Sequence, residues 1–109
     1  MAGKFEVKST ADGRFMFNLK AGNGLVILTS QTYATRDGAL QGIDAVRRHA
    51  AENFNYDRRT ASDGSPYFVM VAANAVEIGR SEMYSSAAAV ENGVASIKAN
   101  APDAEISDA

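Results

Sequence analysis

Residues 14–24 read Arg-Phe-Met-Phe-Asn-Leu-Lys-Ala-Gly-Asn-Gly, and residues 65–75 read Ser-Pro-Tyr-Phe-Val-Met-Val-Ala-Ala-Asn-Ala. Both stretches place apolar side chains at alternate positions and end in an asparagine turn. The offset between them continues outward without a gap and places Tyr84 on Tyr33 (84 − 33 = 51). Turn residues and apolar residues that recur together at one fixed offset indicate an internal duplication.

Each repeat predicts three strands followed by a helix. The apolar residues first have a period of two. Asp-Gly pairs in both repeats, Asn23-Gly24 in repeat one and Asn74 in repeat two indicate hairpin turns between the strands. The spacing then becomes helical after Thr35, whose hydroxyl we expect to cap the first turn, and Ser86 holds the same place in repeat two. The expected strands are residues 4–8, 14–20, 25–29, 54–58, 67–71 and 76–80.

The length of the chain, 109 residues, suits one compact domain. We divide residues 1–109 into repeat one, residues 3–53, and repeat two, residues 54–109. A unit of about 50 residues buries too small a fraction of its surface to be stable alone, so we expect the two repeats to share one core. The chain has no cysteine and no long apolar run, and we expect a cytoplasmic protein.

A longer motif resembles the strand-turn-strand signature of the YegP-like family of small uncharacterised bacterial proteins. The residues that carry the resemblance are Arg14 to Gly24, Ile27, Ser30, Tyr33 and Gly42-Ile43. The resemblance covers nearly the whole chain twice. It implies units of three strands, a helix and a short closing strand, which share one antiparallel sheet and exchange their last strands. On that basis residues 54–58 serve both units, and residues 104–107 form the terminal exchanged strand.

Repeat two departs from this motif, because Ser65-Pro66-Tyr67 stands in place of Arg14-Phe15-Met16. We therefore do not expect two equivalent sites.

The predicted fold is α+β with pseudo-twofold symmetry, in which two helices pack on one face of the sheet. Alternation along the strands assigns eight apolar side chains to the helix-covered face: Phe17, Leu19, Leu25, Ile27, Phe68, Met70, Val76 and Ile78. It assigns six others to the opposite face, as a candidate partner surface: Met16, Val26, Leu28, Tyr67, Val69 and Val71.

Motifs for catalysis or for cofactor binding are missing from the sequence. His49 is the single histidine and lies near the expected end of the first helix, without a second histidine or a cysteine to complete a metal-binding set. We assign no catalytic, cofactor-binding or metal-binding residue.

The leading hypothesis is a non-enzymatic binding or interaction module that uses the open sheet face. The alternative is a small-ligand-binding protein or enzyme with a groove between the repeats, where Ser30, Tyr33, Ser81 and Tyr84 supply polar groups. The same four residues can equally stabilise local structure. A weaker alternative is the binding of single-stranded nucleic acid, with bases stacked on aromatic side chains of the sheet. The net charge of −2 is unfavourable for this alternative. We expect no membrane association. We also expect a monomer, because the duplication already provides the core that dimerisation would provide.

Overall fold

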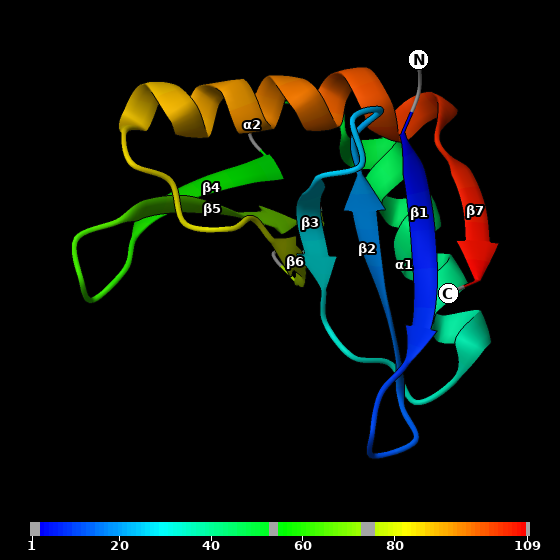
Figure 1. The fold of residues 1–109 in the computed structure, drawn as a ribbon. Coiled ribbons are helices and arrows are strands. Elements are labelled where there is room, and N and C mark those ends of the chain that lie inside the picture. The colour runs from blue at the N-terminus through cyan, green and yellow to red at the C-terminus, as the bar shows by residue number, and fades with distance from the viewer. Residues whose placement is uncertain (1–2, 53–54, 73–75, 109) are drawn as a thin grey trace.

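The structure is a computed structural model that describes residues 3–52, 55–72 and 76–108. Its strands are β1 (Lys4–Ser9), β2 (Phe15–Lys20), β3 (Val26–Ser30), β4 (Tyr56–Thr60), β5 (Pro66–Val71), β6 (Glu77–Arg80) and β7 (Glu105–Asp108). Its helices are α1 (Arg36–His49), α2 (Ala87–Asn100) and the short 3₁₀ turn η2 (Ala101–Asp103). The described strands form one sheet in the order β4-β5-β6-β3-β2-β1-β7, so the predicted α+β fold is confirmed (Figure 1).

Local sequence signals explain the ends of these elements. Gly13, Gly24 and Gly64 have φ angles of 81°, 84° and 88°, as the predicted hairpin turns require. Both predicted helix caps are also confirmed. The Thr35 side chain accepts a hydrogen bond from the Gly38 amide of α1 at 3.0 Å, and Ser86 does the same at the start of α2.

The two repeats meet where β3 pairs with β6 in antiparallel fashion. Thr29 lies opposite Arg80, and Ser30 lies opposite Gly79. Because Arg80 is the repeat-two counterpart of Thr29 (80 − 29 = 51), this pair maps onto itself when the repeats are exchanged. The pseudo-twofold axis therefore passes through the junction. The order β4-β5-β6 on one side mirrors β1-β2-β3 on the other, and β7 is added beyond β1.

The exchanged strand is present, but its direction differs from the antiparallel sheet that we predicted. β7 follows α2 of repeat two and pairs with β1 of repeat one in parallel, so the sheet is mixed. The α2 helix crosses the sheet and η2 turns the chain onto the far edge, so β7 reaches β1 by a crossover rather than a hairpin. We also predicted that residues 54–58 serve both units. Among the described residues, β4 pairs only with β5, and Phe54 lies outside those residues.

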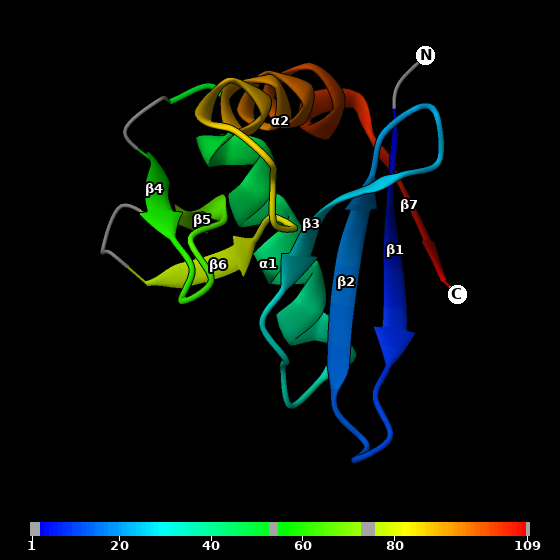
Figure 2. The ribbon, with the colours of Figure 1, turned by 60° about the vertical axis from the view of Figure 1, so that its left-hand side comes forward.

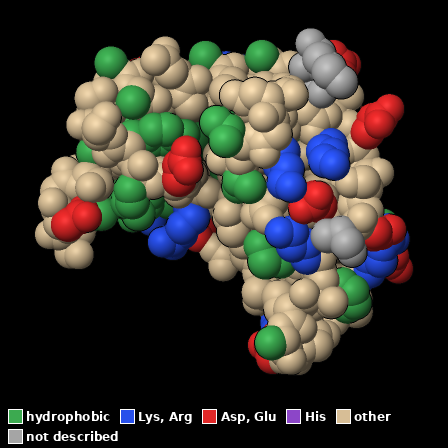
Figure 3. Space-filling model, viewed as in Figure 1, with side chains coloured by type: hydrophobic (Ala, Val, Ile, Leu, Met, Phe, Trp, Pro, Cys, Tyr) green, Lys and Arg blue, Asp and Glu red, His purple; other side chains and the backbone are tan. Residues whose placement is uncertain are grey.

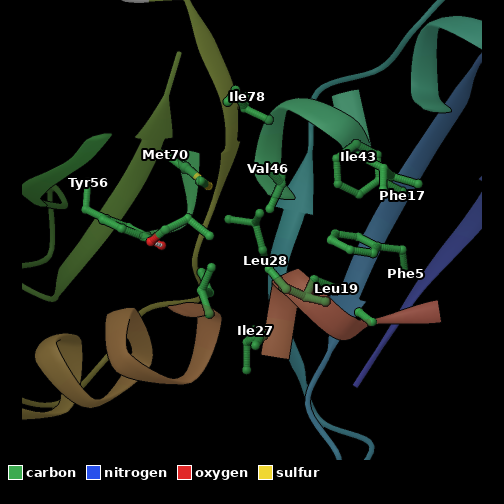
Figure 4. Close-up of a cluster of buried hydrophobic side chains, with 14 of the residues drawn as sticks. Phe5, Phe17, Leu19, Ile27, Leu28, Ile43, Val46, Tyr56, Met70 and Ile78 are labelled. Atoms are coloured by element: carbon green, nitrogen blue, oxygen red, sulfur yellow. Dashed lines mark hydrogen bonds between the residues drawn. The ribbon is translucent and has the colours of Figure 1, made fainter. Parts of the chain in front are cut away.

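The shared core lies between the sheet and the two helices, as Figure 4 shows for α1 and the strands of both repeats. Side chains from both repeats belong to one buried cluster, including Phe17 with Ile43 in repeat one and Met70 with Ile97 in repeat two. Six of the eight side chains that we assigned to the helix-covered face are in this cluster: Phe17, Leu19, Ile27, Phe68, Met70 and Ile78.

A β-bulge explains where the alternation argument failed in repeat one. Leu19 pairs with Leu28, but the next residue, Lys20, pairs with Val26, so β3 has an extra residue at this point. Leu28 is therefore turned into the core and is fully buried, against the prediction, while Leu25 is 63% exposed. The same irregularity follows Met70 in repeat two, where Val76 is 58% exposed.

Neither of the described α-helices is both long enough and apolar enough to cross a membrane.

Candidate functional site

The sheet face opposite the helices is not the apolar surface that the sequence predicts. Leu28 belongs to the core, and Val69 is fully buried. The remaining four candidates are only partly exposed: Met16, Val26, Tyr67 and Val71. A guanidinium group, that of Arg80, lies 6.0 Å from the centre of the Tyr67 ring. The predicted surface is thus reduced to separate, half-covered side chains.

Paired charges occupy much of this face. In repeat one, Glu6 lies 3.9, 3.6 and 3.2 Å from the ammonium groups of Lys4, Lys8 and Lys20. The hydrogen bond from Lys20 is the main cause that lowers the pKa of the Glu6 carboxyl below its ordinary value. Figure 3 shows basic and acidic side chains side by side over β1–β3. Such mixed charge does not provide the uniform positive surface that nucleic acids require.

The two predicted serines hold local structure. Ser30 Oγ accepts a hydrogen bond from the Phe17 amide at 2.8 Å and donates to the Gln31 carbonyl at 2.7 Å. Ser81 Oγ makes the equivalent bonds, at 3.0 Å from the Phe68 amide and at 2.8 Å to the Glu82 carbonyl. Each serine therefore ties the chain leaving one strand to the neighbouring strand.

The two predicted tyrosines hold the corner between the last strand and the helix of each repeat. The Tyr33 ring stacks on Phe17 with 6.3 Å between ring centres, and Tyr84 stacks on Phe68 at the same distance. Burial raises the pKa of both phenols above the ordinary value. All four residues therefore have contacts that stabilise the structure of their own repeat.

A groove between the repeats is nevertheless present. Its volume is about 480 Å³, and Gln31, Tyr33 and Arg48 from repeat one line it together with Glu77 and Ile78 from β6 of repeat two. Of the four residues that we predicted for such a groove, Tyr33 is the one that lines it.

A second candidate site is the outer edge of β4, which the sequence analysis did not identify. β4 pairs with β5 on one side, and its residues 57–60 are exposed. Figure 2 shows β4 at the end of the sheet, away from β7. We call the side of this strand that faces away from β5 the β4 edge. At the opposite end of the sheet, β7 covers the equivalent edge of β1.

A pocket of about 200 Å³ adjoins the β4 edge. We call it the β4 pocket, and its lining residues are Arg58, Arg59, Thr60, Pro66, Tyr67, Ala87, Val90 and Glu91. It lies between the two strands of the β4–β5 hairpin and the first turns of α2.

Differences between the repeats explain why this pocket is open. Its repeat-one counterparts include Phe15 and Leu40, which pack against the core. Pro66 and Glu91 stand at those positions in repeat two, and neither fills the same apolar volume. The sequence shows that Pro66 stands in place of Phe15. Whether this replacement leaves a pocket depends on which distant residues pack against Pro66.

Arg58 borders both the β4 pocket and the β4 edge. It stands where repeat one has the buried Val7, and its Nε and Nη2 atoms donate to the Glu91 carboxylate at 2.9 and 2.7 Å. This bidentate contact lowers the pKa of Glu91. Arg58 Nη1 also donates to the carbonyl of Tyr56 at 3.0 Å. The ion pair between Arg58 and Glu91 therefore stands where repeat one has the apolar side chain of Val7.

Among the described residues, no group of three or more His, Cys, Asp or Glu side chains is placed to hold a metal ion. His49 lies in the last turn of α1, and its backbone carbonyl accepts a hydrogen bond from the Asn55 side chain. The described geometry assigns it no chemical role.

The comparisons with known proteins agree with the duplicated fold. The family model "Domain of unknown function (DUF1508)" matches twice, at residues 11–57 and 61–108. The UPF0339 protein of Bordetella pertussis is 47% identical over 99% of this chain and 96% of its own length. The UPF0339 protein YegP of Escherichia coli is 44% identical, with 99% and 98% covered.

Two solution NMR structures have the same fold. The protein of unknown function yegP from E. coli matches with a TM-score of 0.93 and 44% identity, over 99% of this chain and 93% of that one. The UPF0339 protein SO3888 from Shewanella oneidensis matches with a TM-score of 0.92 and 42% identity, over 99% and 92%. No specific function is named for these relatives. The chain therefore belongs to the YegP-like UPF0339 family and contains two tandem copies of its domain of unknown function.

Proposed function

We propose that this protein is a non-enzymatic, cytoplasmic interaction module that binds an extended segment of another protein along the β4 edge. The observation that supports the proposal is a difference in strand pairing between the two ends of the sheet. β1 is covered by β7, whereas β4, its counterpart, pairs only with β5 among the described residues. An uncovered strand edge is a ready-made template for a further strand.

The hydrogen-bond pattern of the hairpin indicates which groups a partner would meet. The Ala61 amide donates to the Ser65 carbonyl, so the alternation of an antiparallel ladder directs the amides of Arg59 and Asp57 toward β5. The amides of Tyr56 and Thr60 then point away from β5. They give the β4 edge two residues for main-chain pairing.

Peptide selection on the immobilised full chain tests this proposal. Random ten-residue peptides are selected, and their binding is mapped by amide chemical shifts. We expect shifts centred on Tyr56 and Thr60. The Thr60→Pro variant removes an outward amide without removing a bond to β5, so it should abolish binding.

Ser9→Pro is the matched control, because Ser9 holds the same place in β1 (60 − 9 = 51). It should leave peptide binding unchanged. The proposal is wrong if the selected peptides shift amides of the charged sheet face instead, or if Thr60→Pro and Ser9→Pro bind them equally well.

The groove between the repeats favours a second candidate function, the binding of a small ligand. Its volume of about 480 Å³ and its lining by both repeats support this candidate. A fragment screen read by amide shifts of Gln31 and Ile78 tests it. Fragments that bind with no shift at either residue would contradict it.

We also propose a monomer in solution. The shared core supports this proposal, because the second repeat already supplies the apolar surface that a second copy would. Sedimentation equilibrium that gives the mass of two chains would contradict this proposal.

A further inference from the structure

We infer that β7 is a releasable strand and that an extended segment of another protein takes its place on β1. We call the side of β1 that faces away from β2 the β1 edge. Residues 105–108 leave this edge, while Ala104 stays in the core. The site lies at the opposite end of the sheet from the β4 edge, so it is separate from the proposed function.

The chain is firmly held up to Ala104, directly before β7. Ala104 is 1% exposed and belongs to the buried cluster, and its carbonyl accepts a hydrogen bond from Nη2 of Arg47. The Arg47 guanidinium also lies 5.4 Å from the centre of the Phe5 ring. These contacts do not involve residues 105–108. Ala104 is therefore a fixed root from which β7 can detach.

The strand β7 itself has few stabilising side-chain contacts. Its apolar side chain, Ile106, is 40% exposed and lies outside the buried cluster of the described residues. Asp108 accepts hydrogen bonds from Arg36 Nη2 at 2.9 and 3.1 Å, but the two side chains are 65% and 46% exposed. Exposed ion pairs contribute little to stability. The docking of β7, the outermost strand beside β1 in Figure 1, therefore depends mainly on main-chain hydrogen bonds.

The register of the ladder indicates which main-chain groups hold β7. The Thr10 amide donates to the Arg14 carbonyl at 2.8 Å, so alternation along β1 turns the amide and carbonyl of Phe5 away from β2. Phe5 lies opposite Ile106 in the parallel ladder, which places the Ser107 amide to donate to the Phe5 carbonyl. Another extended segment offers the same main-chain groups and can make the same bonds.

Two side chains of β7 indicate the chemistry of the partner segment. Ile106 lies opposite Phe5, which is buried in the core. Asp108 lies opposite Val7, two positions further along, and pairs with Arg36 at the start of α1. A partner that repeats this spacing has an apolar residue opposite Phe5 and an acidic residue two positions later. It covers the same apolar surface and binds the same guanidinium group.

A titration of the isotope-labelled full chain tests the inference. The probe is the synthetic peptide Glu-Ile-Ser-Asp-Thr-Val, which repeats residues 105–108 and has two further residues to pair along β1 as far as Ser9. In the Ser107→Pro variant, β7 loses the amide that faces the Phe5 carbonyl and should detach. We expect the peptide to bind this variant at least about tenfold more tightly than the parent, in which β7 competes for the β1 edge. Amide shifts of Phe5 and Val7 measure the binding.

Ser107→Ala is the matched control, because it removes the hydroxyl and keeps the main-chain amide. It should bind the peptide as weakly as the parent does. Amide exchange shows whether the opening is local: in Ser107→Pro the Phe5 amide should lose protection, while the amides of Val46 and Ile97 in the helices keep theirs. Equal peptide affinity of the parent and both variants would overturn the inference. General loss of protection in Ser107→Pro would overturn it too, because β7 would then be inseparable from the core.

The ion pair provides a second, milder test. Asp108→Ala removes the exposed contact between β7 and Arg36 without changing the main chain, so it should raise the affinity for the peptide about threefold. Replacing the aspartate of the peptide by alanine should weaken its binding to Ser107→Pro about threefold, because the peptide then loses Arg36. Unchanged affinity in both experiments would overturn the inferred acidic residue of the partner.

A nitroxide label on the peptide determines its direction. In the inferred parallel orientation, a label at the N-terminus broadens the amide signal of Lys4, and a label at the C-terminus broadens that of Ser9. The reverse pattern would overturn the inference, as would peptide shifts at Tyr56 and Thr60 instead of β1. A Ser107→Pro chain that sediments as a dimer would overturn it as well, because a second copy would then occupy the edge. The two sites fail separately, since peptide selection on the β4 edge tests the proposed function alone.

Discussion

At the scale of single residues, the two repeats use the same close contact between a helix and a tyrosine. A Cβ atom at Gly42 would lie 2.3 Å from Tyr33 Oη and 2.8 Å from its Cζ, and Gly93 has the same distances to Tyr84. Such distances are far below van der Waals contact. Glycine is therefore required here for space, since α1 and α2 have ordinary helical backbones at these positions.

Gly42→Ala tests this close contact. Alanine favours a helix by about 1 kcal/mol over glycine, but the displaced ring has to leave its stacking on Phe17, and overpacking costs about 1–3 kcal/mol. We expect a net loss of stability of about 1 kcal/mol in urea unfolding. Gly38→Ala in the same helix, where the nearest atoms would be 3.3 Å away, is the control and should be neutral or stabilising. Equal effects of the two substitutions would show that the ring contact is unimportant.

Three tyrosines make stability depend on pH in the alkaline range. Tyr56 donates a buried hydrogen bond to the Ala50 carbonyl at 2.7 Å, and burial raises its pKa, as it does for Tyr33 and Tyr84. A raised pKa means that the folded state holds the proton more tightly than the unfolded state. The resulting stability is present below the unfolded pKa of about 10 and is lost as pH rises above it.

The Tyr56→Phe variant tests this assignment. At pH 7 we expect it to lose about 1 kcal/mol, because the Ala50 carbonyl loses its partner. Above pH 10 the free energy of unfolding should fall less steeply with pH than in the parent, since one buried phenol is gone. Urea unfolding at several pH values measures both effects. Parallel curves for parent and variant would contradict the assignment.

At the scale of elements, the two edges of the sheet differ although their strands are repeats of each other. β1 has a neighbour on both sides, β2 and β7, while β4 pairs with β5 alone among the described residues. An exposed pair, Arg36 with Asp108 at 2.9 Å, lies at the end of β7, but such pairs contribute little. The parallel ladder itself therefore distinguishes the two edges.

Amide hydrogen exchange tests this difference without any substitution. Phe5, which faces β7, should exchange slowly, whereas Tyr56, its counterpart on β4, should exchange faster by at least about tenfold, since local opening reaches the end of a sheet first. Exchange followed by NMR measures both amides in one sample. Equal protection of the two strands would mean that the β4 edge is covered in solution.

At the scale of the whole molecule, the repeats are joined through a close backbone contact at the pseudo-twofold axis. A Cβ atom at Gly79 would lie 2.6 Å from the Thr29 carbonyl oxygen and 3.2 Å from the Ser30 Cα. Both neighbours are main-chain atoms of the other repeat, so no side chain can turn away to make room. The junction between the repeats therefore depends on this glycine.

Gly79→Ala should consequently lower the free energy of unfolding by about 2 kcal/mol, through backbone displacement at the junction. Arg80→Ala at the neighbouring position is the control, and because it removes only exposed contacts it should cost less than about 1 kcal/mol. Thermal unfolding measures both. A Gly79→Ala protein as stable as the parent would show that the junction tolerates a wider separation of β3 and β6.

Residues 1–51 alone should not fold into a stable monomer. This fragment lacks β7, which covers β1, and it lacks α2, whose Val94 and Ile97 belong to the shared core. We expect the poorly dispersed amide spectrum and the gradual melting of an unfolded chain. A sharp, cooperative melting transition in a monomeric fragment would contradict the shared core.

The sequence by itself determined the duplication, the α+β class, the hairpin glycines and the caps Thr35 and Ser86, because each depends on residues close together in the chain. Only the tertiary structure decided that a bulge turns Leu28 inward, that β7 runs parallel to β1 and that a pocket lies between the β4–β5 hairpin and the first turns of α2. These features depend on contacts between distant segments. Alternation predicts a side chain's face only while the register is regular, and one extra residue reverses it.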